Sequence, residues 1–576
     1  MAQQNFAKEE RNARLSSYWK ADRYAEYGLI ASATCKDPPY GPRDVATVLD
    51  EVLARAPDSP ALIDRHVRLS YRDLDARVNA AAAAMSALGV RPGSRVAGSS
   101  INDSELVVAF LATQRLGAIW VGINRAYAAP EKRHLIEDSG ATLFLCDAAT
   151  ATDAQQWDIV RDGLTKVETI IPGDASCQWR RTVDLHAGAS RPQVVIDPAA
   201  PAAIAYTSGT TGFPKGVVHS QHNMIVTALI SSEYSGDGQP ETVRGTALPM
   251  TILNVMILGP VTAFATGASH VNLDRIDAVG VAEWIAAERI NNINLVPTIV
   301  HDLLTRDDID PADLDSVKWL VVGGSTVPKS LPELYRARFG KRMTVGYGLT
   351  EGPNGVAKTT EHSPDMAGVI GRPLPHLALA ILDESGAEVP RGTVGEIAIR
   401  PTDQGPWASV YTPTLGYWRN AAATAKLLRG GWVHTGDIGL QDEDGEFHIR
   451  ERGSDLILRG GANVYPAEVE RVLRQHPQVR DCAVLGKPDE RLGQAVVAFI
   501  EPSRLEDDGT SLTGELQALC EQNIARFKIP AEWFIVKTMP RNAMGKIVKG
   551  KLTARWSAVL KPSPKRGAQS GGPGPA

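Results

Sequence analysis

The chain reads Ala205-Tyr206-Thr207-Ser208-Gly209-Thr210-Thr211-Gly212-Phe213-Pro214-Lys215-Gly216 between residues 205 and 216. The last ten of these residues hold four hydroxyl side chains, three glycines and one lysine. Glycine lets backbone N–H groups close around an anion, hydroxyls donate hydrogen bonds, and lysine adds positive charge, so the stretch predicts a polyphosphate-binding loop. It is not a Walker A loop, because that pattern requires Ser or Thr after its lysine, and Gly216 follows Lys215.

Helical patterns alternate with short apolar runs before this loop. Ser70 and Asp73 form a capping box in front of a helix predicted at 71–88, and a strand is predicted at Arg95–Ser99. A second helix, at 104–116, leads to an apolar run at 118–123, and a further helix is expected from about Gln221. Such alternation predicts an α/β fold. Other buried strands are expected at Thr142–Leu145, Thr169–Ile171 and Trp319–Val322.

The length of 576 residues exceeds what one hydrophobic core supports, so at least two domains are expected. After Arg450 a turn-rich segment, Gly453-Ser454-Asp455, leads into a compact stretch with its own helix (466–475) and strands (482–485 and 495–500). The end of the chain is rich in Pro, Gly and Ser, which favours disorder. We predict an N-terminal extension at 1–45, a large domain at 46–451, a small C-terminal domain at 452–560 and a disordered tail at 561–576.

The composition, 43% hydrophobic and 22% charged, is typical of a globular protein, and the net charge of -5 argues against a nucleic-acid partner. Five scattered cysteines and a polar start without a signal peptide favour the cytoplasm; Cys482 and Cys520 are expected in the core. The apolar stretch 247–268 has about the length of a membrane-spanning helix, which needs roughly 20 residues. Pro249 and Gly259-Pro260 interrupt it, so we predict a buried helix followed by a buried strand.

The run TSGTTGFPKG resembles the phosphate loop of the adenylate-forming (AMP-binding) superfamily, in its acyl-CoA synthetase branch. The resemblance spans roughly residues 45–555, because further segments fit the family in the expected order. It implies a large domain of stacked α/β subdomains and a small, mobile α+β domain. The segments are Gly323–Pro328, Gly346–Glu351, Trp432–Asp437, Glu451–Glu470 and Pro540–Lys546.

The resemblance implies ATP, Mg²⁺ and coenzyme A as ligands. Thr350 would contact the α-phosphate, and Glu351 would hold Mg²⁺, which prefers one or two carboxylates plus substrate phosphates. Tyr347 would lie on the adenine, and the Asp437 carboxylate would accept hydrogen bonds from both ribose hydroxyls. The other nucleotide-binding residues implied are Thr207, Ser208, Gly209, Thr210, Thr211, Lys215, Gly324, Ser325, Gly346 and Arg452.

The small domain would carry the catalytic lysine, Lys546, and the glycines facing the pantetheine channel, Gly460 and Gly461. A lysine between the substrate carboxylate and the α-phosphate would offset their repulsion during adenylation. The family places Asp or Lys at the hinge pivot, but this chain has Ser454. His219 and His222 are spaced like metal ligands, but a third ligand is absent nearby, so a pair at a helix start is favoured.

The acid substrate is expected to contact the segment Leu248–Thr266. This segment has no aspartate for an amino-acid amine, and neither 248–269 nor 295–300 offers a cation for a second carboxylate. Ile252 replaces the histidine with which many related segments begin. We therefore expect an apolar monocarboxylic acid: a fatty, aromatic or sterol side-chain acid.

Two alternatives to an acyl-CoA ligase stay open. One is an acyl-AMP ligase that delivers to a carrier protein in trans; the other is a catalytically silent nucleotide-binding protein, whose expected signature is loss of the lysine or glutamate retained here. Neither a nucleic acid nor a membrane span is expected among the partners. Association of identical chains is not decided by the sequence.

Overall fold

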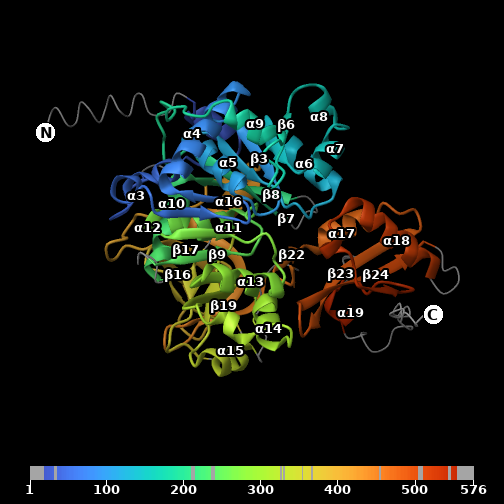
Figure 1. Cartoon of the computed structure of the whole chain (residues 1–576). Helices are drawn as coiled ribbons and strands as arrows, with labels where there is room; N and C mark the ends of the chain where they lie inside the picture. Colours follow the sequence, from blue (N-terminus) through green and yellow to red (C-terminus); the bar gives the residue numbers. More distant parts are fainter. Residues whose placement is uncertain are drawn as a thin grey trace, which may run out of the picture.

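The computed structural model describes residues 18–31, 35–208, 214–234, 241–324, 327, 331–352, 355–364, 368–452, 456–503, 510–541 and 547–553. Figure 1 shows a large body, coloured from blue to orange, and a smaller red body formed by the C-terminal elements. The predicted α/β class is confirmed. Within the described residues the strands form three sheets.

The first sheet has the order β18-β8-β7-β4-β3-β5-β6. Strands β7, β4, β3, β5 and β6 run parallel, whereas β8 pairs antiparallel with both β7 and β18. Residues 214–220, for which no strand was expected, therefore form the second arm of a hairpin. The strands are β3 (Arg95–Ser99), β4 (Ile119–Gly122), β5 (Leu143–Cys146), β6 (Lys166–Thr169), β7 (Pro201–Ser208), β8 (Pro214–Ser220) and β18 (Gly416–Tyr417).

The second sheet has the order β16-β17-β19-β20-β15-β14-β13-β12-β11-β9-β10-β1-β2. Its strands from β13 to β1 are parallel and those from β16 to β14 are antiparallel. The strands are β1 (Pro60–Ile63), β2 (Arg68–Ser70), β9 (Val243–Thr246), β10 (Ser269–Asn272), β11 (Asn292–Leu295), β12 (Trp319–Gly323), β13 (Thr344–Tyr347), β14 (Ala357–Lys358), β15 (Val369–Pro373), β16 (Leu377–Leu382), β17 (Gly395–Pro401), β19 (Val433–Gln441) and β20 (Phe447–Arg452).

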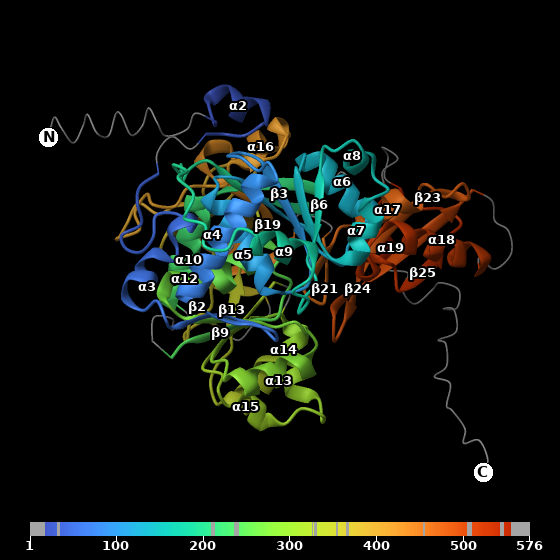
Figure 2. The ribbon, with the colours of Figure 1, turned by 45° about the horizontal axis from the view of Figure 1, so that its top comes forward.

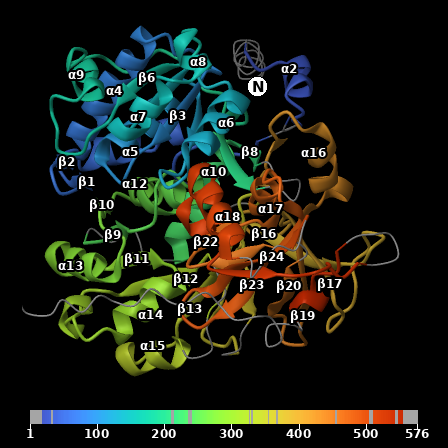
Figure 3. The ribbon, with the colours of Figure 1, turned by 90° about the vertical axis from the view of Figure 1, so that its right-hand side faces the viewer.

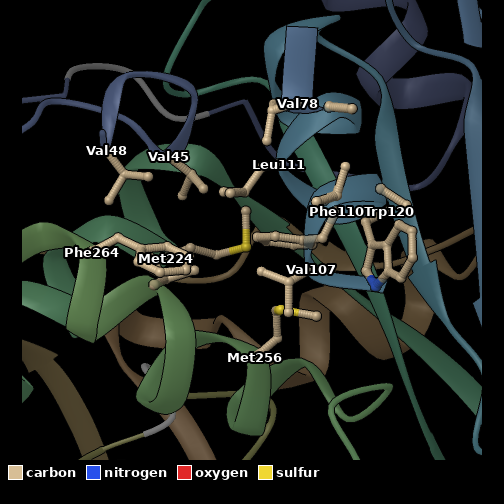
Figure 4. Packing of buried hydrophobic residues seen from close by; sticks show 14 of the residues in the cluster. Val45, Val48, Val78, Val107, Phe110, Leu111, Trp120, Met224, Met256 and Phe264 are labelled. Carbon is tan, nitrogen blue, oxygen red and sulfur yellow. The ribbon is translucent and has the colours of Figure 1, made fainter. Parts of the chain in front are cut away.

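Helices of the large body build its main core. Figure 4 shows Val78, Phe110, Met224 and Phe264, from four different helices, meeting in one apolar cluster. The helical elements are α2 (Ala21–Glu26), η1 (Val45–Thr47), α3 (Asp50–Arg55), α4 (Tyr71–Ala87), α5 (Ser104–Arg115), α6 (Ala129–Ser139), α7 (Ala148–Ala154), α8 (Asp158–Arg161), α9 (Gln178–Asp184), α10 (Gln221–Tyr234), α11 (Leu253–Met256), η2 (Ile257–Val261), α12 (Thr262–Thr266), α13 (Ala278–Glu288), α14 (Pro297–Thr305), η3 (Pro311–Leu314), α15 (Leu331–Phe339), α16 (Ala421–Leu427) and η4 (Arg429–Gly431).

The small body is built on a sheet of its own, β22-β21-β24-β23, with β25 beside β24. In Figure 3 this body faces the viewer, and in Figure 2 it lies next to α6 and α7. β20 belongs to the second sheet of the large body and β21 to the sheet of the small body, so the chain passes from one sheet to the other between Arg452 and Ile457. The elements are β21 (Ile457–Arg459), β22 (Ala462–Val464), α17 (Pro466–Leu473), β23 (Val479–Asp489), β24 (Gly493–Pro502), α18 (Thr510–Asn523), η5 (Arg526–Lys528), β25 (Glu532–Ile535) and α19 (Gly550–Thr553).

Most element predictions are confirmed to within a few residues. Ser70 and Asp73 form the expected capping box at the start of α4. The stretch 247–268 forms consecutive helical elements, α11, η2 and α12, ahead of β10, and no helix in the described ranges is long and apolar enough to cross a membrane. The strand predicted at Thr169–Ile171 is displaced: β6 spans Lys166–Thr169 and ends level with the end of β5 at Cys146.

Candidate active site

A cavity of about 2420 Å³ lies between the two sheets and the small body. Pockets for one small ligand have about 300–1000 Å³, so this one has room for more than one. Its lining joins residues that lie far apart in the sequence. The predicted site residues that line it are Thr207, Lys215, Gly324, Gly346, Tyr347, Thr350, Glu351, Asp437, Gly460 and Gly461.

The remaining predicted residues are only partly placed. Ser208 ends β7 opposite Pro214, and Arg452 ends β20 opposite Asp437, but their side chains lie outside the described part of the chain. The residues that lie wholly outside it are Gly209, Thr210, Thr211, Ser325, Ser454 and Lys546.

The β7–β8 hairpin flanks the predicted phosphate loop, and we call it the stem of that loop. Thr207 and Lys215 are direct neighbours across this hairpin. The Thr207 hydroxyl donates a hydrogen bond to the Glu351 carboxylate over 3.0 Å, and the Lys215 Nζ lies 5.2 Å from the centre of the Tyr417 ring. The stem of the predicted phosphate loop and the predicted Mg²⁺ ligand therefore meet in space.

The Glu351 carboxylate accepts a second hydrogen bond, from the Tyr417 hydroxyl on β18, over 3.0 Å. Burial, together with the neighbouring carboxylate, raises the pKa of Tyr417 well above its usual value, so this phenol stays a donor. Tyr417 lies 66 residues from Glu351 and was not among the predicted site residues. Two hydroxyl donors hold this carboxylate at the cavity wall.

The backbone of Thr350 is held by His219. The His219 Nε2 lies 2.8 Å from the Thr350 carbonyl oxygen, and burial lowers the pKa of His219. The neutral imidazole thus donates to this carbonyl. His222 is also buried, with Nε2 2.8 Å from the Val410 carbonyl oxygen, so both histidines have structural partners.

A metal cage built only from protein side chains is absent among the described residues, where no group of three or more His, Cys, Asp or Glu side chains is arranged to hold an ion. Glu351 fits a different kind of site. Its carboxylate lines the cavity beside the phosphate-loop stem, and Mg²⁺ commonly takes one or two protein carboxylates and completes its shell with phosphates and water.

Tyr347 and Asp437 meet at another part of the cavity wall. The Tyr347 hydroxyl donates to the Asp437 carboxylate over 2.7 Å, although the residues are 90 positions apart. The Thr435 hydroxyl accepts from the Asp437 backbone N–H over 3.0 Å and fixes the turn. Gly323 and Gly346 are paired on β12 and β13, and a Cβ on Gly323 would lie 2.8 Å from the Gly346 carbonyl oxygen. These glycines allow the strand ends to approach closely.

The segment predicted to contact the acid also lines the cavity, through Leu248, Pro249, Ile252 and Leu258 among others. Ile252 keeps 39% of its surface exposed. The segments 248–269 and 295–300 contain no Lys or Arg, as the sequence shows, but Lys358 on β14 lines the same cavity. Burial lowers the pKa of Lys358 to about 8. Lys358 lies outside 248–269 and 295–300, the two segments expected to contact the acid.

The small body reaches the cavity through the β21–β22 turn. Gly460 and Gly461 both adopt positive φ, and a Cβ on Gly461 would lie 2.6 Å from Cγ1 of Val296 in the large body. Arg491 of the small body pairs with Asp302 over 2.8 Å. These contacts place the turn against the large body in this arrangement.

Comparisons with known proteins agree with this geometry. The AMP-binding enzyme family model matches residues 49–407, and the AMP-binding enzyme C-terminal domain matches residues 468–546. The chain is 32% identical to indoleacetate–CoA ligase of Aromatoleum aromaticum (84% of this chain, 92% of that protein) and 31% identical to feruloyl-CoA synthase of Amycolatopsis sp (87% and 96%). The solved structure of amide bond synthetase McbA from Marinactinospora thermotolerans matches with a TM-score of 0.76 and 28% identity (89% and 99%).

The fold and these similarities define an enzyme of the adenylate-forming, acid–CoA ligase class, which uses ATP, Mg²⁺ and CoA. The chain belongs to the AMP-binding enzyme family.

Proposed function

We propose that this protein is an AMP-forming acyl-CoA ligase for a carboxylic acid with an apolar body. The observation that carries the proposal is the hydrogen bond from Thr207 to Glu351, which joins the phosphate-loop stem to the predicted Mg²⁺ ligand. Both residues line a cavity that extends to Leu248 and Leu258 on one side and to Gly460-Gly461 on the other. One space thus holds candidate sites for ATP, the acid and the acyl acceptor.

In the first half-reaction the acid's carboxylate oxygen attacks the α-phosphorus of ATP, and pyrophosphate leaves. We propose that the phosphate loop with Lys215 binds the polyphosphate and that Thr350 orients the α-phosphate, its backbone held by His219. Mg²⁺ held by Glu351 would neutralise phosphate charge. Lys546 is proposed to offset the repulsion between the carboxylate and the α-phosphate.

The nucleoside of ATP is proposed to lie at Tyr347 and Asp437. The hydrogen bond between them, 2.7 Å long, keeps the Asp437 carboxylate oriented. Gly324, Gly346 and Arg452 complete this part of the proposed site. A ribose that binds Asp437 would compete with the Tyr347 hydroxyl for the same carboxylate oxygen, and the freed tyrosine ring could then cover the adenine.

In the second half-reaction the thiol of CoA attacks the acyl carbon, loses its proton, and displaces AMP. We propose that the arrangement described here serves this step, because the β21–β22 turn with Gly460-Gly461 lies at the cavity. The small domain, proposed to begin at residue 452, would rotate about the segment that carries Ser454 to bring Lys546 in for adenylation. The change of sheet between β20 and β21 supports this boundary.

The test is a pyrophosphate-release assay over a panel of fatty, aromatic and sterol side-chain acids, with and without CoA. Release that depends on one acid class, with acyl-AMP accumulating until CoA is added, is expected. If a pantetheinylated carrier protein or an amine consumes the acyl-AMP and CoA does not, then that carrier protein or amine, and not CoA, is the acyl acceptor. ATP turnover that no acid stimulates would overturn acid activation itself.

A further inference from the structure

The side chains of the second sheet of the large body alternate between its two faces. Ile293, Leu295, Leu320 and Val322 point to one face, where they form an apolar cluster with residues of α13, α14 and α15. The residues between them point to the other face. Thr246, Asn294 and Val321 are register partners on adjacent strands of that other face, and all three line the cavity.

Lys358 continues this row of cavity-facing positions. Gly346 lies two residues after Thr344, the register partner of Val321, so it shares the cavity face. Lys358 is the direct partner of Gly346 in the antiparallel pair of β13 and β14. Cross-strand partners project to the same face, so the Lys358 side chain leaves the sheet on the cavity side.

The same face carries the segment expected to contact the acid. A Cβ on Gly259 of η2 would lie 2.3 Å from the Thr246 hydroxyl oxygen, so this helical segment packs directly on the row. Tyr347 and its partner Ala357 also line the cavity, but their side chains leave the sheet on the opposite face from Lys358. Lys358 therefore lies on the acid side of the sheet and not on the side of the Tyr347–Asp437 pair.

We propose that the ammonium group of Lys358 binds a second anionic oxygen group of the acid, in the simplest case a carboxylate at the end of the apolar body remote from the activated carboxylate. This inference rests on the proposed function. It changes the expected substrate from a monocarboxylic acid to an acid that carries a second negative charge at its far end. An anion in a partly buried, largely apolar cavity is costly without a cation, and Lys358 supplies one. Asn294, in the same row, offers an amide for a further hydrogen bond.

Recognition of this kind separates acids that differ in one group only. The two acids of a matched pair have the same chain or ring, and one of them bears the second carboxylate. A charge-assisted hydrogen bond typically contributes about 10- to 100-fold in affinity. We expect the wild-type enzyme to activate the dicarboxylic member with a kcat/KM about 10- to 100-fold above that of the monocarboxylic member.

The variant Lys358→Met tests the assignment, since methionine keeps a similar length without the charge. It is expected to lose the preference for the dicarboxylic acid and to keep or raise kcat/KM for the monocarboxylic acid, which also shows that the variant is folded. Lys358→Arg is expected to retain the preference. Lys341→Met, an exposed lysine that does not line the cavity, is the control and should leave both acids unchanged.

Three outcomes separate this inference from the proposed function. A wild-type enzyme that activates only the monocarboxylic members would overturn the role of Lys358 and leave the ligase assignment intact. A dicarboxylic preference that survives Lys358→Met would place the anion elsewhere. Absence of pyrophosphate release with every acid of both kinds would refute the proposed function itself.

Discussion

A buried ion cluster joins the small body to the large one, and its loss should slow one half-reaction selectively. The Lys528 Nζ on η5 lies 2.6 Å from the Glu131 carboxylate on α6 and 2.9 Å from the Glu468 carboxylate on α17. Glu131 also accepts the Ala525 backbone N–H over 2.8 Å. The Lys528 side chain is only 2% exposed. Glu131 thus makes two contacts across the boundary between the bodies.

The Lys528 side chain stays charged in this cluster. Burial by itself would lower the pKa of Lys528, but Tyr127, Glu468 and Glu131 together raise it above its usual value. The ammonium also lies 4.4 Å from the centre of the Tyr127 ring. A charged Lys528 therefore needs its carboxylates in this arrangement of the two bodies.

The perturbation is Glu131→Gln, which keeps the shape of the side chain and removes its charge. Breaking a buried ion pair costs about 3–5 kcal/mol when the remaining charge is left unpaired. Here Glu468 still pairs with Lys528, so a loss of about 1.5–3 kcal/mol, the range for hydrogen bonds to charged groups, is expected. Because Glu131 and Lys528 belong to different bodies, the cost falls on this arrangement alone. The population of this arrangement, relative to any other arrangement of the two bodies, should fall about 10- to 100-fold.

The assay separates the half-reactions in single turnovers. Thioester formation from supplied acyl-AMP and CoA should slow by about 10- to 100-fold, while acid-dependent pyrophosphate release keeps its rate or rises. Glu137→Gln is the matched control on the same helix. Its pair with Arg133 is exposed, 42% for each side chain, and such surface pairs contribute about 0–1 kcal/mol.

Two results would refute this reasoning. If Glu131→Gln slowed both half-reactions equally with its fold intact, the cluster would stabilise the protein and not one arrangement. If the slowed step were pyrophosphate release, the arrangement described here would serve adenylation, and the assignment of Gly460-Gly461 to the thioester step would be wrong.

Further predictions concern individual residues. Lys546→Ala should slow adenylation by about 10²–10³-fold and spare thioester formation from acyl-AMP; equal loss of both would contradict its role. Glu351→Gln should raise the Mg²⁺ requirement, so an unchanged Mg²⁺ titration would remove Glu351 from the metal site. Gly461→Ala, with positive φ and Val296 too close for a Cβ, should slow the thioester step but not pyrophosphate release. Ser454→Pro should preserve one half-reaction and impair the other; wild-type rates for both would exclude this pivot.

The sequence allowed prediction of the features that are local. Capping boxes, glycine stops and apolar periodicity located α4, β3, α5 and α17 to within a few residues, because neighbouring residues determine them. The motifs that contain Thr207, Tyr347 and Asp437 were recognised by their resemblance to a family, and the roles of these residues stay predictions. Each of these residues lies in a short continuous motif.

Contacts between distant segments could not be derived in this way. Tyr417 reaches Glu351 because β18 pairs with β8, and Lys358 reaches the cavity because β14 pairs with β13; neither pairing has a signal in the sequence around these residues. Lys528 and Glu131 are 397 residues apart. The packing of the small body against α6 brings them together. The order of strands in the sheets and the placement of the two bodies are therefore what the structure adds.

The pairing of β13 with β14 also explains where the reacting atoms can meet. Tyr347, at the end of β13, points to the side of the sheet proposed for the nucleotide, and Lys358, at the end of β14, points to the side proposed for the acid. The connection between these two antiparallel strands begins directly after Tyr347. Thr350 and Glu351 lie in this connection, and both line the cavity. We therefore propose that an acid bound at its far end by Lys358 and a nucleotide bound at Tyr347 and Asp437 approach each other beside this connection, where Thr350 and Glu351 would bind the α-phosphate and its metal ion.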